Sequence, residues 1–314
     1  MSLDNDLINK LVKVTSRAAI NCYQFLGKGN KKIVDKAATD SMRNDLNNLE
    51  INGEVVIGEG ELDEAPMLYI GEKVGTGDGM AIDIAVDPVE GTNFVANNLP
   101  GGLSLIAIAE KGKLLNAPET YMNKIAINND IHAECVDLDY SIIKNINNIA
   151  DFKKVKTSEI TACLLDRPRH KNIINELKKL KVNLKLISDG DVSGALMVTD
   201  KKYNVDIFLG IGGGPEGVLA AVALDSYNCK FQGRFIFDNE KSRFRAKKMG
   251  IVDLEKKYEL NELVKGESIL FATGITNGEL VSGVKLKKNE FITETLVTHK
   301  NFSNNIIINK IPNT

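Results

Sequence analysis

The sequence lacks cysteine or histidine pairs at short spacing. Its four cysteines, Cys22, Cys135, Cys163 and Cys229, are scattered along 314 residues, and so are its three histidines. A structural zinc site takes closely spaced Cys or His ligands, and a disulfide framework shows paired cysteine spacings. The pattern therefore predicts neither, and it indicates reduced thiols in a cytoplasmic protein. Any bound metal would be held by oxygen ligands.

A charge excess of either sign and a long apolar run are also lacking. Lys and Arg number 40, Asp and Glu number 42, and the formal net charge is -2. A nucleic-acid-binding protein would show a basic stripe, and a membrane helix needs about 20 apolar residues in a row. The acidic first residues contain no signal-peptide core. We therefore expect a cytoplasmic protein that binds neither nucleic acid nor membrane.

Carboxylates gather where one predicted strand ends. Residues 82–87 alternate between apolar and other residues, which is typical of a strand. Pro88 has no N–H and is expected to end the ladder, and Glu90, Gly91 and Thr92 follow. Carboxylates that ionise together need a cation between them. The stretch indicates the floor of a divalent-metal site or, alternatively, a polar strand end before a capped helix.

Two further acidic positions follow the same logic. Asp35 occupies the position expected for the N-cap of a helix that continues to Leu46, so a simple helix cap is one interpretation. The segment 59–64 follows a predicted strand at 53–58 and combines glycine with acidic residues. Glycines let the backbone approach closely and carboxylates supply hard oxygen ligands. This segment is either a ligand loop or an acidic surface turn.

The second half of the sequence alternates strands with helices. Three strands are predicted, at 161–165, 183–187 and 205–209. Each is followed by a loop of charged residues or glycines and then a helix, which predicts a largely parallel sheet with its loops at one edge. A polar, lysine-rich stretch at about 150–157 marks a candidate boundary. The predicted domains are an N-terminal α+β domain, 1–155, and a C-terminal α/β domain, 156–314.

Charged residues follow the first two of these strands. Arg167 and Arg169 flank Pro168 and could grip a phosphate bidentately, or could be surface arginines. Asp189 and Asp191 half-match a calcium-binding EF-hand loop. A strand precedes them instead of a helix, so acceptors for sugar hydroxyls are the better interpretation.

The third loop, 212–217, has the spacing G-x-G-x-x-G between a strand and a helix. Backbone N–H groups there could hold the pyrophosphate of a dinucleotide. However, Glu216 lies in the first helical turn, where it would repel a pyrophosphate and could instead hold a cation. Carboxylates without a His or Cys cluster favour magnesium or manganese, and hard cations with arginines indicate phosphoryl chemistry.

These motifs together resemble a known family. Asp-Pro-Val-Glu-Gly-Thr at 87–92 is similar to the D-P-[IL]-[DE]-G-T signature of the lithium-sensitive, metal-dependent sugar and inositol phosphatases. With it, the motifs that resemble the bacterial class II fructose-1,6-bisphosphatases lie at 58–68, 166–170, 189–191 and 212–217. The resemblance implies a layered α-β-α-β-α fold of the α/β class. It implies hydrolysis of the 1-phosphate of fructose 1,6-bisphosphate in gluconeogenesis, with more than one Mn²⁺ or Mg²⁺ ion, by a cytoplasmic homo-oligomer.

The resemblance also implies the site residues. The implied metal ligands are Asp35, Glu59, Asp87, Glu90 and Glu216. The implied substrate contacts are Glu90, Gly91, Thr92, Tyr121, Arg167, Pro168, Arg169, Asp189, Gly190, Asp191 and Gly213. The residues implied near the attacking water are Thr92, Asp63 and Lys31. Two departures from the family pattern are Lys36 beside Asp35, where a small residue is usual, and Gly214, where Ala is common.

Other functions stay open at the level of the sequence. Sedoheptulose-1,7-bisphosphatase activity could replace or accompany the first activity. A dinucleotide-binding oxidoreductase would use 212–217, and an inactive sugar-phosphate sensor would keep the binding residues without turnover. Asp83, which shares a strand face with Asp87, is expected to be structural.

Overall fold

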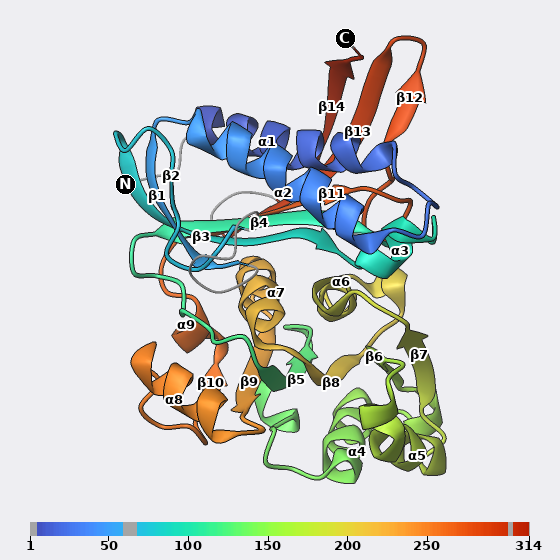
Figure 1. Ribbon diagram of the computed structural model, residues 1–314. Coiled ribbons are helices and arrows are strands. Elements are labelled where there is room, and N and C mark those ends of the chain that lie inside the picture. The colour runs from blue at the N-terminus through green and yellow to red at the C-terminus, as the bar shows by residue number, and fades with distance from the viewer. Residues whose placement is uncertain (1–4, 59–67, 301–303, 314) are drawn as a thin grey trace. The chain divides into compact units, whose positions relative to one another are not determined.

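The computed structural model describes residues 5–58, 68–300 and 304–313, and the chain divides into two compact units (Figure 1). Unit 1 comprises Met1–Leu115 and Lys265–Thr314, and unit 2 comprises Asn116–Val264. Among the helices of these described ranges, none combines the length and apolar character that a membrane crossing requires.

Unit 1 is built on an eight-stranded sheet with the order β12-β13-β11-β4-β3-β1-β2, in which β14 pairs with β13. Its strands are β1 (Ile51–Ile57), β2 (Lys73–Val74), β3 (Met80–Glu90), β4 (Leu103–Glu110), β11 (Ser268–Gly274), β12 (Lys285–Lys287), β13 (Glu290–His299) and β14 (Asn305–Pro312). The pair β1–β3 is parallel, and the central pairs β3–β4 and β4–β11 are antiparallel.

Helices α1 (Asn5–Tyr23) and α2 (Lys31–Asn47) lie together over one face of this sheet (Figure 1). In α1 the buried residues recur at three- and four-residue steps, among them Leu11, Ala18 and Cys22. They share one core with sheet residues such as Ile84 and Ile108. The amphipathic first helix is confirmed and ends three residues before the predicted Leu26.

Unit 2 is built on a six-stranded sheet with the order β10-β9-β5-β8-β6-β7. Its strands are β5 (Tyr121–Ile127), β6 (Thr161–Leu165), β7 (Asn183–Ile187), β8 (Ile207–Gly213), β9 (Lys230–Ile236) and β10 (Lys257–Glu259). Its helices are α4 (Ile142–Lys153), α5 (Lys171–Lys179), α6 (Asp191–Leu196), α7 (Gly214–Ser226), α8 (Glu240–Lys248) and α9 (Leu260–Leu263).

Helices cover both faces of the unit 2 sheet (Figure 1). On one face, Ile149 of α4 and Leu177 of α5 share a core with Ile125 and Ile127 of β5. On the other face α6 and α7 pack together and against β8. Unit 1 has a helix layer on its sheet and unit 2 has helices on both faces of its sheet (Figure 1), so the mixed α/β class is confirmed.

The unit 2 sheet is less parallel than predicted. Strands β6, β7 and β8 run parallel, as their alternation with helices requires. However, β5 pairs antiparallel with both β8 and β9, and β9 pairs antiparallel with β10. The loops after β6, β7 and β8 still lie at one edge, because the carboxyl ends of parallel strands meet there.

The two units also differ from the predicted domains, 1–155 and 156–314. Strand β5 lies before residue 155 but pairs with β8 and β9 of unit 2. Strand β11 lies after residue 155 but pairs with β4 of unit 1. The stretch 150–157 reaches from the end of α4 into the turn after it. Its polarity indicates a surface connection, whereas pairing between distant strands determines the units.

Candidate functional site

The predicted metal floor in unit 1 is a bulged strand end. Asp87 pairs with Leu105 and Glu90 pairs with Leu103, so the register of β3 against β4 shifts between them. The prediction that Pro88 ends the strand is wrong, because the bulge accommodates the proline and β3 continues to Glu90. The Asp87 carboxylate accepts a hydrogen bond from the Val89 N–H at 3.1 Å. Both carboxylates are thereby presented where the strand bends.

The chain then turns sharply into α3 (Thr92–Ala96). Gly91 has φ 74°, in the left-handed region, and a Cβ there would lie 2.7 Å from the Phe94 ring. Glycine is therefore required at this turn. The turn places the Thr92 hydroxyl 3.1 Å from the Val89 carbonyl oxygen.

Asp35 does not cap a helix, so that interpretation is wrong. Helix α2 begins at Lys31, and the Asn30 side chain caps it by accepting from the Ile33 N–H at 3.2 Å. Asp35 instead lies one turn inside α2, and its carboxylate forms a hydrogen bond with Thr92. Two predicted site residues from separate helices are thus brought together.

The electrostatics of Asp35 suit a group that awaits a cation. Burial raises the pKa of Asp35, against the hydrogen bond with Thr92 and the charge of Lys31. Its Oδ1 atom is buried without a hydrogen-bond partner among the described residues. Lys36, the first departure from the family pattern, forms an ion pair with Asp40 at 2.6 Å and is 59% exposed. Its charge is therefore neutralised on the surface of α2.

Asp83 has a structural role, as expected. Its side chain is 1% exposed and accepts hydrogen bonds from the N–H groups of Lys113 (2.9 Å) and Leu114 (3.2 Å). Lys111 lies 3.3 Å from the same carboxylate. The Asp83 carboxylate therefore stabilises the turn after β4 through these hydrogen bonds.

In unit 2, the predicted substrate contacts gather at the edge where β6, β7 and β8 end. The Arg169 Nε donates to the Ile211 carbonyl oxygen at 2.8 Å, and its guanidinium lies 4.8 Å from the centre of the Tyr121 ring. Arg167 forms an ion pair with Asp189 at 3.2 Å. Both arginines are therefore oriented by neighbouring groups, which an unconstrained surface pair would not be.

Two residues without a predicted role, Lys124 and His170, connect the strands and helices at this edge. Lys124 of β5 contacts the Asp191 carboxylate and donates to the Gly213 carbonyl oxygen at 2.5 Å. His170 is fully buried, with Nδ1 2.6 Å from the Leu165 carbonyl oxygen, and its Nε2 accepts from the Ile211 N–H at 2.7 Å. Because Nε2 accepts, Nδ1 carries the proton. Burial lowers the pKa of His170, which favours this neutral form.

A sequence signal exists for the lysine. A single Lys inside an otherwise buried strand has to find an anion or carbonyl partner. The sequence contains no comparable signal for the role of His170, because its hydrogen-bond partners come from β6 and β8.

Glu216 lies in the first turn of α7, as predicted. Burial raises the pKa of Glu216, the charge of Lys124 opposes this effect, and the charge of Asp191 adds to it. The Oε2 atom is buried without a hydrogen-bond partner in the described parts of the chain. A Cβ at Gly213 would lie 1.7 Å from this oxygen, so the carboxylate folds directly over the glycine loop.

The prediction of a divalent-metal site is supported by individual carboxylates, and not by a complete group of metal ligands among the described residues. Within 5–58, 68–300 and 304–313, no three or more Asp, Glu, His or Cys residues are grouped so that they could hold a metal ion. The predicted ligand Glu59 and the predicted catalytic residue Asp63 lie outside the described residues. The buried, unpartnered oxygens of Asp35 and Glu216 nevertheless fit a hard cation, which takes carboxylate ligands.

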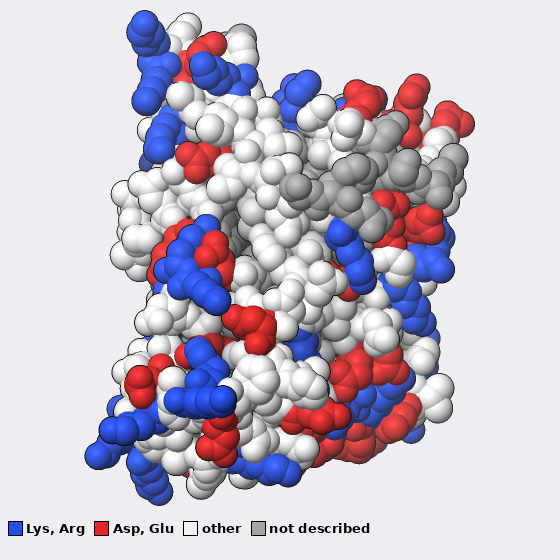
Figure 2. All heavy atoms as spheres, turned by 180° about the vertical axis from the view of Figure 1, so that it is seen from behind, with Lys and Arg blue, Asp and Glu red and all other residues white. Residues whose placement is uncertain are grey.

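Figure 2 shows Lys and Arg side chains intermixed with Asp and Glu side chains over the face that it draws. On this face the described residues form no continuous basic stripe of the kind that a nucleic acid would require.

Comparison with known proteins identifies the family. The family model described as "Bacterial fructose-1,6-bisphosphatase, glpX-encoded" matches residues 5–311. The chain belongs to this family. The resemblance drawn from the motifs is thereby confirmed, and with it the fructose-bisphosphatase class of enzyme, a phosphoric monoester hydrolase.

Curated relatives agree with this assignment. The "D-fructose 1,6-bisphosphatase class 2/sedoheptulose 1,7-bisphosphatase" of Prochlorococcus marinus (strain NATL1A) is 39% identical over 309 residues, covering 94% of this chain and 92% of that protein. The protein of the same name from Synechococcus sp. (strain JA-3-3Ab) is 40% identical over 320 residues, with the same coverage. Among solved structures, the extragenic suppressor protein suhB from Bartonella henselae matches with 13% identity and a TM-score of 0.35, over 62% of this chain and 74% of that chain. That score is too low to support a conclusion.

Proposed function

We propose that this enzyme removes the 1-phosphate of D-fructose 1,6-bisphosphate and releases D-fructose 6-phosphate and phosphate, as a step of gluconeogenesis. The observation that carries the proposal is the edge of unit 2, where Arg167 and Arg169 lie beside Asp189 and Asp191. Guanidiniums bind phosphate oxygens, and carboxylates accept hydrogen bonds from sugar hydroxyls. The edge thus offers both kinds of group that a sugar phosphate presents.

Unit 1 would contribute carboxylates for divalent cations. Asp35, Asp87 and Glu90 lie on α2 and at the bulged end of β3, and Glu59 is proposed as a further ligand. The family resemblance assigns the same role to Glu216. A bound Mn²⁺ or Mg²⁺ would neutralise phosphate oxygens and lower the pKa of an attacking water.

Thr92 is proposed to orient that water. Its hydroxyl has one proton and lies between two acceptors, the Asp35 carboxylate and the Val89 carbonyl oxygen, so its position is defined before substrate binds. Burial raises the pKa of Asp35, and the charge of Lys31 lies close enough to oppose this rise. Lys31 and Asp63 are proposed to share in the proton transfer. Gly91, Tyr121, Pro168, Gly190 and Gly213 are proposed to shape the substrate pocket.

Activity on sedoheptulose 1,7-bisphosphate is the second candidate. The two relatives described above carry both activities in their names. A dinucleotide-binding oxidoreductase is disfavoured, because the Glu216 carboxylate covers Gly213, where the pyrophosphate would have to bind. We further propose a cytoplasmic homo-oligomer, a dimer or a tetramer.

Phosphate release from purified enzyme tests the proposal. Fructose 1,6-bisphosphate and sedoheptulose 1,7-bisphosphate are assayed with manganese, with magnesium and with a chelator. We expect release from the first substrate with either metal and none with the chelator. Calorimetry with NAD should show no binding. Turnover that persists in the chelator, or NAD binding without phosphate release, would overturn the proposal.

A further inference from the structure

We propose that Lys124 is a positioning residue that makes the enzyme selective for the sugar part of its substrate. It would act by fixing Asp191 and the Gly213 carbonyl group behind the substrate edge of unit 2. The inference rests on the proposed function, because Asp191 and Gly213 are substrate contacts only if that function holds.

Lys124 is buried to a degree that is rare for lysine. Its side chain is 1% exposed, in a strand whose neighbours Met122 and Ala126 are fully buried. Alternation along β5 places it on the face opposite Ile125 and Ile127, on the side of α6 and α7. A Cβ at Gly217 of α7 would lie 3.5 Å from the lysine Cδ. The helix therefore contacts the lysine stem.

The ammonium group joins the starts of two helices. It contacts the carboxylate of Asp191, the first residue of α6, and donates to the carbonyl oxygen of Gly213, the N-cap of α7, at 2.5 Å. An ammonium group has three donors and no acceptor, so both contacts can form at once. Asp191 is itself only 10% exposed, and without Lys124 its charge would be unpaired in a poorly hydrated place. Its carboxylate would then turn towards water.

This arrangement separates recognition of the sugar from recognition of the phosphate. Lys124 holds Asp191, one of the two proposed acceptors for sugar hydroxyls, together with the Gly213 carbonyl group. The arginines are held by other groups: Arg169 by Ile211 and Tyr121, and Arg167 by Asp189. Loss of the lysine should therefore weaken binding of a sugar phosphate and leave binding of phosphate alone nearly unchanged.

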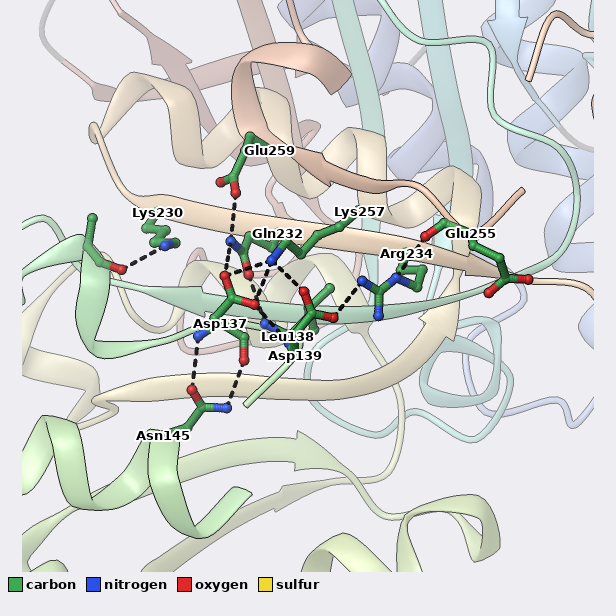
Figure 3. A network of polar contacts seen from close by, with 11 residues as sticks. Asp137, Leu138, Asp139, Asn145, Lys230, Gln232, Arg234, Glu255, Lys257 and Glu259 are labelled. Carbon is green, nitrogen blue, oxygen red and sulfur yellow. Dashed lines mark hydrogen bonds and ion pairs between the residues drawn. The ribbon is translucent and has the colours of Figure 1, made fainter. Parts of the chain in front are cut away.

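A second lysine of unit 2 provides the matched control (Figure 3). Lys257 of β10 pairs with Asp137 at 2.6 Å and with Asp139 at 2.7 Å, and Arg234 pairs with Asp139 at 2.7 Å. Gln232 connects Asp137 to Glu259, with contacts of 3.1 Å and 2.6 Å. Although burial alone would raise it, hydrogen bonding by Lys257 and neighbouring groups holds the pKa of Asp137 at about 2. The network joins β9, β10 and the segment 137–139, and it contains no proposed substrate contact.

Calorimetry with fructose 6-phosphate and with inorganic phosphate tests the proposal, in the presence of manganese. For Lys124→Met we expect the Kd of fructose 6-phosphate to rise about 10- to 100-fold, since hydrogen bonds to charged groups are lost, while the Kd of phosphate changes less than about threefold. Lys257→Met should change neither Kd. If Lys124→Met weakens both ligands alike, or neither, Lys124 does not position the sugar contacts.

A double-mutant cycle tests the route through Asp191. If Lys124 acts by orienting this carboxylate, Lys124→Met should add little to the Kd of fructose 6-phosphate in Asp191→Asn. Additive losses would overturn the proposal. Should Lys124→Met fail to fold, Lys124→Gln keeps a donor in the buried position and is measured in the same way. Because binding is measured without turnover, a wild-type enzyme that binds fructose 6-phosphate but hydrolyses no bisphosphate would contradict the proposed function and not this inference.

Discussion

The two strand ends that carry the proposed site residues differ in how their charges are balanced. In unit 1, Asp87 and Glu90 lie on either side of the bulge in β3, and the nearby Asp35 keeps a buried oxygen without a partner among the described residues. In unit 2, Arg167 is paired with Asp189, and Lys124 with Asp191. Asp35 in unit 1 therefore keeps an unsatisfied buried oxygen, whereas the charges named in unit 2 are paired.

This difference agrees with the proposed roles of the two units in metal binding and substrate recognition. A buried carboxylate oxygen without a partner, such as Asp35 Oδ1, is unfavourable until a cation binds, so this part of unit 1 suits metal binding. Paired charges are already stable and hold a fixed geometry, so the edge of unit 2 suits recognition of a substrate. Glu216 is an exception in unit 2, because its Oε2 atom resembles the unpartnered oxygen of Asp35.

The largest effect should follow from changing the strand end of unit 1. Asp87→Asn is expected to lower kcat at least about 1000-fold at limiting manganese, because the variant loses a charged ligand at constant size. The measurement is phosphate release during a manganese titration. Asp83→Asn is the matched control on the same strand. Asp83→Asn should lower the melting temperature and leave kcat largely intact. Near-normal turnover of Asp87→Asn would show that Asp87 is not a metal ligand.

A smaller effect in the same unit should isolate the hydroxyl group. Thr92→Val is expected to reduce kcat about 100- to 1000-fold with little change in KM, since the lost group acts on the water. Steady-state kinetics measure the changes in kcat and in KM separately. Thr92→Ser keeps the hydroxyl and should recover most of the activity, while an unchanged kcat in Thr92→Val would remove this residue from the mechanism.

Substitutions at the substrate edge of unit 2 should affect substrate binding instead of turnover. Arg169→Lys removes the planar group that lies over Tyr121 and reaches Ile211. We expect KM to rise about tenfold with kcat nearly constant, because lysine cannot reproduce a bidentate, stacked guanidinium. Arg234→Lys, in the network of Figure 3, is the control and should leave KM unchanged. A fall in kcat at constant KM would show that both units serve turnover.

The smallest effect concerns stability without metal. Since burial raises the folded-state pKa of Asp35, ionisation of this group destabilises the fold above its unfolded pKa of about 4. Asp35→Asn should therefore raise the melting temperature of the metal-free enzyme by about 2–4 °C at pH 7. The gain should disappear below about pH 4, where the wild-type carboxyl is protonated in both states.

Thermal melts with and without manganese measure this effect. The wild-type melting temperature should rise more on metal addition than that of Asp35→Asn, because the variant has lost a ligand. Equal responses of the two proteins to manganese would contradict a role for Asp35 in metal binding.

Local sequence was sufficient for several elements. The amphipathic spacing in α1 and the short strands β6 and β7 followed from periodicity. The motif at 87–92 identified a polar strand end, because an alternating run followed by Pro and Gly has few other structures available. The position of Glu216 in the first turn of α7 followed from the glycines before it.

The remaining features depended on contacts between distant segments. Asp35 meets Thr92 only because α2 packs beside α3, and Lys124 meets Asp191 only because β5 pairs with β8 and α6 lies over the sheet. Because β11 pairs with β4, the C-terminal segment from Lys265 onwards likewise belongs to unit 1. Sequence alone determined which residue types stand at the strand ends, since that is a local property. The tertiary structure decided which charges are paired and which carboxylates, such as Asp35 and Glu216, keep a buried oxygen without a partner among the described residues. The reason is that the partners are far apart in sequence and are selected by packing.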